Sequence, residues 1–277
     1  MQVAEPLVSS WKASLALGFT FGDRKTTLSR KFHDGPLVVQ KPLYPEGGEV
    51  CHAIVVHPPG GIAGGDELTL DVQADKSASA LLTTPGAAKW YRSSGPLAKQ
   101  SLSFNVAGTL EWLPQETIVF DGALAETEYA ADLAGDAGLI GWDIVCLGRT
   151  GSGERFTRGS YRTSIRIRRD GRTLWLERGR IDGGGRLLDS PAGLAGSPVF
   201  GTLFVASLNL NKELLNEARK PQPEAGRGSV TLLPGILLAR YLGDSSEAAR
   251  RYFIELWRIL RPAVAGREAV EPRIWRT

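Results

Sequence analysis

Short apolar runs and alternating apolar and polar positions dominate the chain from Trp11 to about Ile181. The run CHAIVVHP (51–58) is apolar between turn residues, which is typical of a strand buried on both faces. The stretch DELTLDVQ (66–73) alternates, so its leucines and valine share one side of a strand. Glycine is frequent, at 33 residues, and favours many turns between short strands. This part of the chain is therefore predicted to be β-structure.

Two segments in this region have the signature of β-hairpins. SLALGFTFGDRKTTLSRKF (14–32) is predicted to turn near Gly22-Asp23. TSIRIRRDGRTLWLER (163–178) is predicted to turn at Asp170-Gly171, a pair that suits the positive φ values of a type I′ turn. Together with the alternating runs, these hairpins favour a mainly antiparallel β protein.

The pattern changes after residue 182. GGGRLLDSPAGLAGSP (183–198) is typical of a loop, and residues 211–220 predict a short helix stopped by Pro221. VTLLPGILLARYLG (230–243) favours two strands because Pro-Gly interrupts it. We therefore expect a β-rich body over 1–182 and a C-terminal part over 183–277 packed on it, as one continuous domain.

The last helix is predicted over about residues 246–261. Asp244 can cap it with Glu247 three residues on, as in a capping box, and Pro262 is expected to end it. One apolar stripe follows at helical spacing: Phe253, Leu256, Trp257 and Leu260. The fold class predicted from the pattern is thus mainly β with two α-helices in the C-terminal third.

Charge and composition exclude several classes of protein. Thirty-three basic residues oppose thirty acidic ones, and the net charge of +3 is too small and dispersed for a nucleic-acid-binding field. The densest basic run, RIRRDGR (166–172), is interpreted as the exposed face of a hairpin. No window approaches the roughly 18 apolar residues of a membrane span, and the N-terminus lacks a signal-peptide pattern. With only two cysteines, a cytoplasmic protein without disulfides is expected.

Nucleotide binding and serine hydrolysis are not supported by any motif. GGIAGGDEL (60–68) has acids where a phosphate-binding loop needs lysine, and a strand pattern follows it instead of a helix. TGSGE (150–154) lacks the spacing of a nucleophile elbow.

The histidines and cysteines do not form an obvious metal site. Cys51, His52 and His57 lie within seven residues, but neighbouring strand residues point to opposite faces. Cys51 and His57 share a face yet are separated by about 20 Å, at ~3.3 Å per residue. We interpret them as a buried thiol beside structural histidines, although the sequence leaves open whether any of the three contacts a metal in passing.

Several carboxylates at predicted strand ends or turns are compatible with an enzyme. They are Asp66, Glu67, Glu111, Glu116, Asp121 and Asp143. A glycosidase needs two acids about 5–9.5 Å apart across a sugar, and a sequence does not show that pairing. A β-helical carbohydrate-active enzyme with paired carboxylates is therefore the alternative hypothesis.

Six segments, in order along nearly the whole chain, resemble the urease accessory protein UreD (UreH) family. They are GPLVVQKPLYPE (35–46), CHAIVVHPPGGIAGGDEL (51–68), LLTTPGAAKWYRSSG (81–95), LEWLPQETIVF (110–120), WDIVCLGR (142–149) and EPRIWRT (271–277). The resemblance implies an all-β, helix-like stack of sheets with a small helical addition. It implies a non-catalytic protein that binds apo-urease with UreF, which recruits the GTPase UreG, and helps deliver Ni²⁺ to the urease active site along an internal channel.

The family blocks also suggest which residues serve such a role. Matching them points to Glu46, Asp66, Asp143 and Glu177 as acids in or near the channel, with Glu67 beside Asp66 as a further candidate. Carboxylates, carbonyls and water hold Ni²⁺ less tightly than nitrogen and sulfur ligands, which suits transit and implies no tightly bound cofactor.

A candidate partner-binding surface lies in the third block. Lys89, Tyr91 and Arg92 are expected there because tyrosine and arginine are favoured at interface hot spots. Alternatively, Tyr91 is a half-buried strand residue.

Overall fold

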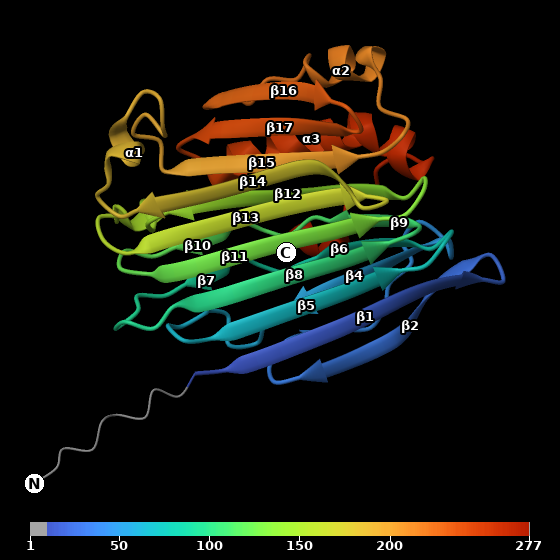
Figure 1. The fold of residues 1–277 in the computed structure, drawn as a ribbon, viewed down its shortest axis with the longest axis horizontal. Helices are drawn as coiled ribbons and strands as arrows, with labels where there is room; N and C mark the ends of the chain where they lie inside the picture. The colour runs from blue at the N-terminus through green and yellow to red at the C-terminus, as the bar shows by residue number, and fades with distance from the viewer. Residues whose placement is uncertain (1–9, 277) are drawn as a thin grey trace, which may run out of the picture.

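The computed structural model describes residues 10–276, which form two stacked β-sheets (Figure 1). The seven-stranded sheet has the order β14 (Arg172–Asp182), β13 (Ser160–Arg169), β11 (Leu124–Leu133), β8 (Ala98–Val106), β5 (Glu67–Ala74), β1 (Lys12–Gly22) and β2 (Lys25–Asp34). The ten-stranded sheet has the order β16 (Arg227–Leu233), β17 (Ile236–Gly243), β15 (Val199–Ala206), β12 (Gly138–Leu147), β9 (Thr109–Trp112), β6 (Ser79–Thr83), β4 (Val50–Val56) and β3 (Val38–Val39). It is completed by β10 (Thr117–Val119), which pairs with β12 and with β7 (Ala88–Trp90).

The chain moves back and forth between the two sheets in the body of the protein. β4, β6, β9 and β12 belong to the ten-stranded sheet, and β5, β8, β11 and β13 to the other. Each time the chain returns to a sheet, the new strand starts at the same end of that sheet as the previous one. Neighbouring strands therefore pair in parallel, as β5 does with β8 and β6 with β9. The prediction of a mainly β fold is confirmed. Antiparallel pairing is wrong for the body and holds only towards the sheet ends, as in β1–β2, β13–β14 and β15–β17.

Local sequence signals set the individual strands. β4 is buried along nearly its whole length, and β5 alternates with Leu68, Leu70 and Val72 buried, as predicted. Asp170 and Gly171 have φ values of 48° and 78° in the β13–β14 turn, which confirms that hairpin.

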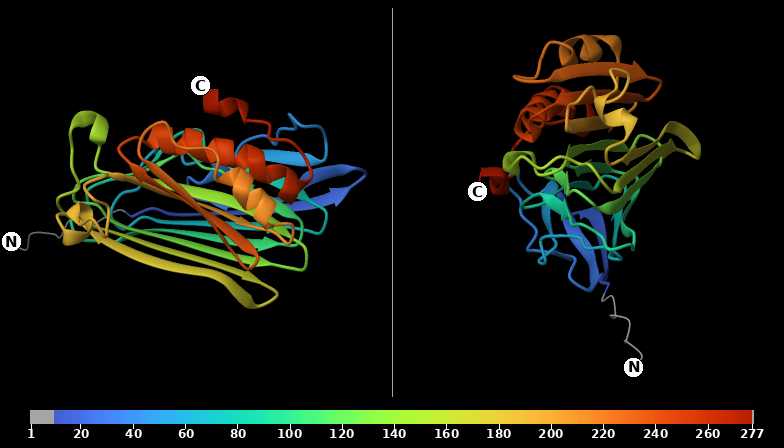
Figure 2. Two further views of the ribbon diagram at one scale, coloured as in Figure 1. Left: turned by 90° about the horizontal axis from the view of Figure 1, so that it is seen from above. Right: turned by 90° about the vertical axis from the view of Figure 1, so that its left-hand side faces the viewer.

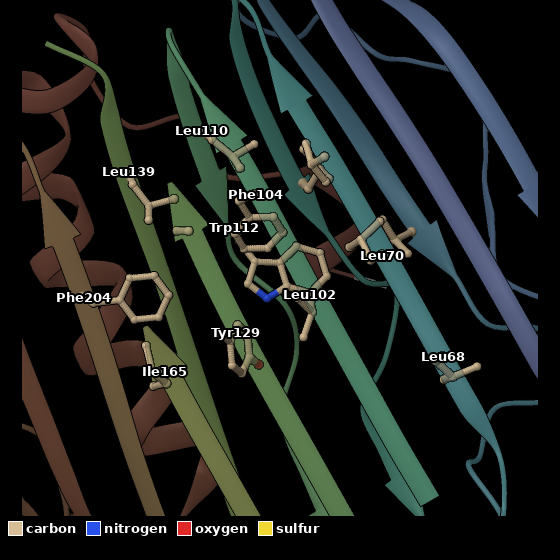
Figure 3. Packing of buried hydrophobic residues seen from close by; sticks show 14 of the residues in the cluster. Leu68, Leu70, Leu102, Phe104, Leu110, Trp112, Tyr129, Leu139, Ile165 and Phe204 are labelled. Carbon is tan, nitrogen blue, oxygen red and sulfur yellow. The ribbon is translucent and has the colours of Figure 1, made fainter. Parts of the chain in front are cut away.

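Two apolar layers hold the architecture together. One fills the space between the sheets, and Figure 3 shows its centre, with Trp112, Phe104 and Phe204 pointing inward. The second lies between the outer face of the ten-stranded sheet and α3 (Ser246–Ala265), which crosses β12 and β15 (Figure 2). The predicted stripe of α3, with Trp257 in it, is fully buried in this second layer. The long helix therefore closes the face of the sheet that the seven-stranded sheet does not cover.

The helix boundaries correct two details of the sequence interpretation. Ser245, rather than Asp244, caps α3, since its hydroxyl accepts a hydrogen bond from Ala248 N at 3.1 Å. Pro262 does not end the helix, because near its C-terminus the missing N–H removes only one bond, and α3 continues to a left-handed glycine, Gly266.

The other helices are short. α2 (Lys212–Ala218) confirms the helix predicted over 211–220 and is capped by Asn211. The stretch predicted as a loop after residue 182 contains one helical turn, α1 (Arg186–Asp189), and 3₁₀ turns occur at Thr150–Ser152 and Arg273–Arg276. Among the described residues no helix is long and apolar enough to cross a membrane.

Candidate functional site

A row of polar side chains crosses the inner face of the ten-stranded sheet. Strand register places Asp143 (β12) beside Thr202 (β15), and Thr202 beside Arg240 (β17). Arg240 donates to Thr202 Oγ1 at 2.6 Å and to both carboxylate oxygens of Glu177 (β14), at 2.9 and 2.7 Å. Asp143 and Glu177, two of the acids predicted to lie in or near the channel, are therefore linked through one row of side chains. We call Asp143, Thr202, Arg240 and Glu177 the inter-sheet polar row.

Asp143 is the most unusual member of this row. Its side chain is only 7% exposed, and its two hydrogen bonds, from Thr117 Oγ1 and Tyr161 Oη, are both long at 3.4 Å. Burial raises the pKa of Asp143 from 3.8 to about 6, helped by the charge of Glu177 and opposed by these hydrogen bonds. At neutral pH the fold therefore holds a buried, weakly compensated negative charge between its sheets.

A cavity of about 270 Å³ adjoins this row between the sheets. Thr117, the hydrogen-bond donor to Asp143, also lines the cavity. Its walls combine apolar side chains, including Leu68, Leu70 and Trp112 (Figure 3), with scattered polar ones: His57, Thr84, Lys89, Gln100 and Gln115. The buried Nε2 of His57 and Nε1 of Trp112 have no hydrogen-bond partner within residues 10–276. Such a mixed lining can bind water and small polar species.

His57 supplies a neutral nitrogen to the cavity. Burial lowers the pKa of its imidazole, and the nearby charge of Asp66 only partly opposes this. The ring is therefore uncharged at neutral pH and does not repel a cation.

Asp66 and Glu67 have different environments although they are adjacent. Asp66 is 5% exposed, and its carboxylate accepts hydrogen bonds from Trp11 N and Ala63 N, both at 2.8 Å, which closes the turn before β5. Glu67 lies on the surface, where Lys12 Nζ is 3.5 Å away. Neither acid is part of the inter-sheet polar row.

The glycines ahead of Asp66 permit close packing. A Cβ on Gly61 would lie 2.0 Å from the Tyr91 ring, and one on Gly64 would lie 2.3 Å from Ser93 Oγ. The glycine-rich stretch is therefore a turn that packs tightly against the segment after β7, not a phosphate cradle.

Glu46 belongs to a buried ionic cluster on the opposite face of the ten-stranded sheet, beneath α3. Arg261, which is fully buried, holds Glu46 at 2.7 and 2.8 Å and Glu111 at 2.9 and 3.0 Å. His52 Nε2 is 2.6 Å from Glu46, and Trp257 donates to Glu111 at 2.6 Å. Burial opposes the charge of Glu46, but its bonds to His52 and Arg261 outweigh this and lower the pKa of its carboxyl. We call these five residues the α3 ionic cluster.

The cysteines and histidines do not converge. Cys51 faces the space between the sheets, whereas His52 faces α3, as strand alternation predicts. Cys146 lies on the α3 side, and both thiols are buried and free. Within residues 10–276 no group of three or more histidine, cysteine or acidic side chains is arranged to hold a metal ion.

The predicted partner-binding residues lie around a surface groove of about 700 Å³. Lys89 and Tyr91 line it, and the 40% exposed Tyr91 packs edge-on against Phe120, with ring centroids 5.1 Å apart. The guanidinium of Arg149 lies 4.7 Å from the centre of the Phe120 ring. Arg92 points elsewhere and packs against Gly122. We call this the β7 groove; it brings together two of the three predicted residues.

The alternative of a paired-acid glycosidase is not favoured. Glu46 and Glu111 are both neutralised by Arg261 beneath a helix. Burial opposes the charge of Asp121, but bonds from Arg158 and Thr157 lower the pKa of its carboxyl. These acids are committed to structural partners and do not face each other across an open cleft.

Sequence reasoning missed the basic partners of the acids. Arg240 and Arg261 are far in sequence from the acids they bind: Arg261 and Glu46 are 215 positions apart, and Arg240 and Glu177 are 63 apart. The available signal was an arginine on the apolar stripe of the last helix, because a buried arginine requires an acidic partner.

Comparisons with known proteins agree with the resemblance in the sequence. The family model "UreD urease accessory protein" matches residues 12–276. The urease accessory protein UreD of Azoarcus sp. (strain BH72) is 54% identical, over 100% of this chain and 97% of its own length. Those of Dechloromonas aromatica (strain RCB) and Pseudomonas aeruginosa (strain PAO1) are 54% and 56% identical over 97% of this chain, and 95% and 96% of their own lengths. The chain therefore belongs to the UreD family of urease accessory proteins.

Proposed function

We propose that this chain is a non-catalytic scaffold that binds apo-urease together with UreF, with UreG joining through UreF. We further propose that it helps deliver Ni²⁺ to the urease active site along a route between its two sheets. Family membership supports a role in urease maturation. The observation that carries the route is Asp143, a buried carboxylate beside a cavity of about 270 Å³. Nickel is cargo in this account.

The chemistry of the inter-sheet polar row suits passage of a cation better than storage. Asp143 is ionised above about pH 6 and attracts a cation, but a single carboxylate with hydroxyl neighbours binds Ni²⁺ weakly enough to release it. Glu177, 27% exposed and paired with Arg240, lies nearer the surface. Exchange of Arg240 for an arriving cation would let Glu177 act as the entry or exit of the route.

The other acids predicted to lie in or near the channel have supporting roles in this proposal. Asp66 holds the turn that carries His57 towards the cavity, and Glu67 supplies negative charge at the surface beside it. Glu46 supports α3 through Arg261, so any contact with nickel would require that ion pair to open. A route past Asp143 and Glu177 does not need Glu46.

The β7 groove is the proposed partner surface. Tyr91 and Phe120 offer an aromatic contact, with Arg149 beside it. Lys89, Asp244 and Glu247 also line the groove, and Arg149 is paired with Glu154. Tyrosine, phenylalanine and arginine around a depression are side chains enriched at interface centres.

Co-expression tests the maturation role. Urease structural subunits and the other accessory proteins would be produced with and without this chain in limiting nickel, and urease activity and bound nickel measured. We expect loss of both without the chain at unchanged urease protein levels. Full activity without it would refute the proposed function.

A further inference from the structure

The outward face of the β13–β14 hairpin carries five arginines. Register pairs Arg162 of β13 with Arg180 of β14, and Arg166 with Leu176, so these side chains lie on one face. Arg168 and Arg178 extend the same face by the two-residue period of a strand. The opposite face carries Tyr161, Ile165 and Ile167, which are buried. We call the five outward residues, Arg162, Arg166, Arg168, Arg178 and Arg180, the arginine ridge.

The ridge is only partly neutralised. Arg168 binds Asp132 at 2.6 Å, Arg180 binds Asp182 at 2.9 Å, and Arg162 lies 3.8 Å from Glu126. Arg166 and Arg178 have no carboxylate within 4.0 Å in the described part of the chain, and both are exposed. The ridge therefore presents two positive charges without a close ion-pair partner, although, after the hydrogen bond from Arg168, the charge of Arg166 also acts on Asp132 and lowers the pKa of its carboxyl.

The ridge also offers an edge and an apolar contact. β14 is the end strand of the seven-stranded sheet, and among residues 10–276 it pairs only with β13. Leu176, next to Arg166 across the strands, is 50% exposed. An unpaired strand edge with an exposed leucine between arginines is suited to an extended segment.

The charge pattern indicates which kind of molecule binds to the arginine ridge. A second copy of the ridge would bring like charges together. A nucleic acid is disfavoured because Glu126, Glu128 and Asp132 lie on the adjacent strand β11 and the net charge of the chain is only +3. An extended acidic segment of a protein fits, since acids at alternate positions repeat every ~6.8 Å, as the arginines do.

We propose that the arginine ridge docks an extended acidic segment of a protein in the urease maturation complex. This rests on the proposed function for the identity of the complex, but the ridge itself is separate from the inter-sheet polar row and from the β7 groove. The bound segment lies along β14, with acids at alternate positions on the arginine-bearing face, near Arg166 and Arg178.

A peptide assay tests the ridge directly. The probe is a fluorescein-labelled 12-residue peptide alternating glutamate and valine, measured by anisotropy with the full chain at about 50 and 200 mM NaCl. Arg166→Glu/Arg178→Glu should weaken its binding roughly tenfold or more at the lower salt. The matched control, Arg30→Glu/Lys31→Glu, makes the same charge change on exposed residues of β2, at the other end of the sheet, and should stay within about twofold.

Three peptide-assay results would overturn the proposal: equal weakening by the control, equal binding of a lysine–valine peptide, or tighter binding of a 12-nucleotide oligothymidylate. A second experiment is a pull-down that measures whether the tagged full chain retains apo-urease and UreF. The ridge variant should lose them at about 200 mM NaCl while the control keeps them. If both variants keep them, the ridge proposal fails and the proposed function survives. If the wild-type chain retains neither protein, the proposed function fails and the peptide assay still judges the ridge.

Discussion

Replacing Arg261 with methionine should destabilise the fold by roughly 3–5 kcal/mol, the usual cost of removing one partner from a buried ion pair. Arg261 has no exposed surface, and it forms the ion pairs with both buried carboxylates, Glu46 and Glu111. Methionine fills a similar volume, so a cavity contributes little. The loss comes from two carboxylates left beneath α3 with only His52 and Trp257 as partners.

Urea unfolding followed by tryptophan fluorescence measures this loss, and thermal unfolding should show a fall of roughly 10 °C for a chain of this size. Arg258→Met is the matched control on the same helix: its side chain is 54% exposed, and its pair with Glu271 should be worth at most about 1 kcal/mol. Adding Glu46→Gln and Glu111→Gln to Arg261→Met should recover part of the stability, since no buried charge then lacks a partner. Equal, small losses for Arg261→Met and Arg258→Met would show that the buried carboxylates do not depend on Arg261.

The remaining predictions concern single residues. Burial raises the pKa of Asp143 from 3.8 to about 6, so its charge costs stability as pH rises through 6. Asp143→Asn should therefore stabilise the fold by at most about 3 kcal/mol at pH 7.5, and should not stabilise it at pH 3.5. Equal urea midpoints of the variant and the wild type at pH 7.5 would contradict this. Asp66→Ala should cost about 1–3 kcal/mol in urea unfolding and Glu67→Ala about 0.5 kcal/mol or less, because only Asp66 is buried and accepts hydrogen bonds from two backbone N–H groups. Tyr91→Ala should weaken UreF or urease binding by about 1 kcal/mol or more in titration calorimetry, and unchanged affinity would remove the β7 groove as an interface.

The elements that local signals specify were predictable, and the way they pair was not. The hairpin at Asp170-Gly171 and the buried strand β4 follow from turn chemistry and apolar pattern. The same patterns occur in parallel and antiparallel sheets, so they do not reveal that successive strands alternate between two sheets. Likewise, Pro262 is an ordinary stop signal, but the last turn of a packed helix tolerates it.

The candidate site was predictable in its acids and not in their environments. Asp143 was identified through the family blocks, but its burial beside Thr202 and Tyr161 depends on strand register. Glu46 came from the same reasoning and lies on the other face of the sheet, bound to Arg261. Long-range contacts of this kind carry no local pattern, which is why the acids resembled one set in the sequence and belong to two in the structure.

The nickel content of urease matured with Asp143→Asn decides whether nickel passes between the two sheets. Wild-type chain, Asp143→Asn and Glu217→Gln, an exposed acid of α2 as control, would each be co-expressed with urease and the other accessory proteins in limiting nickel. Complex formation would be checked by co-purification. We expect that Asp143→Asn keeps the complex and is the more stable protein, yet lowers nickel per urease site severalfold, while the control does not. Full nickel loading with Asp143→Asn would show that the ion does not pass between the sheets at this point.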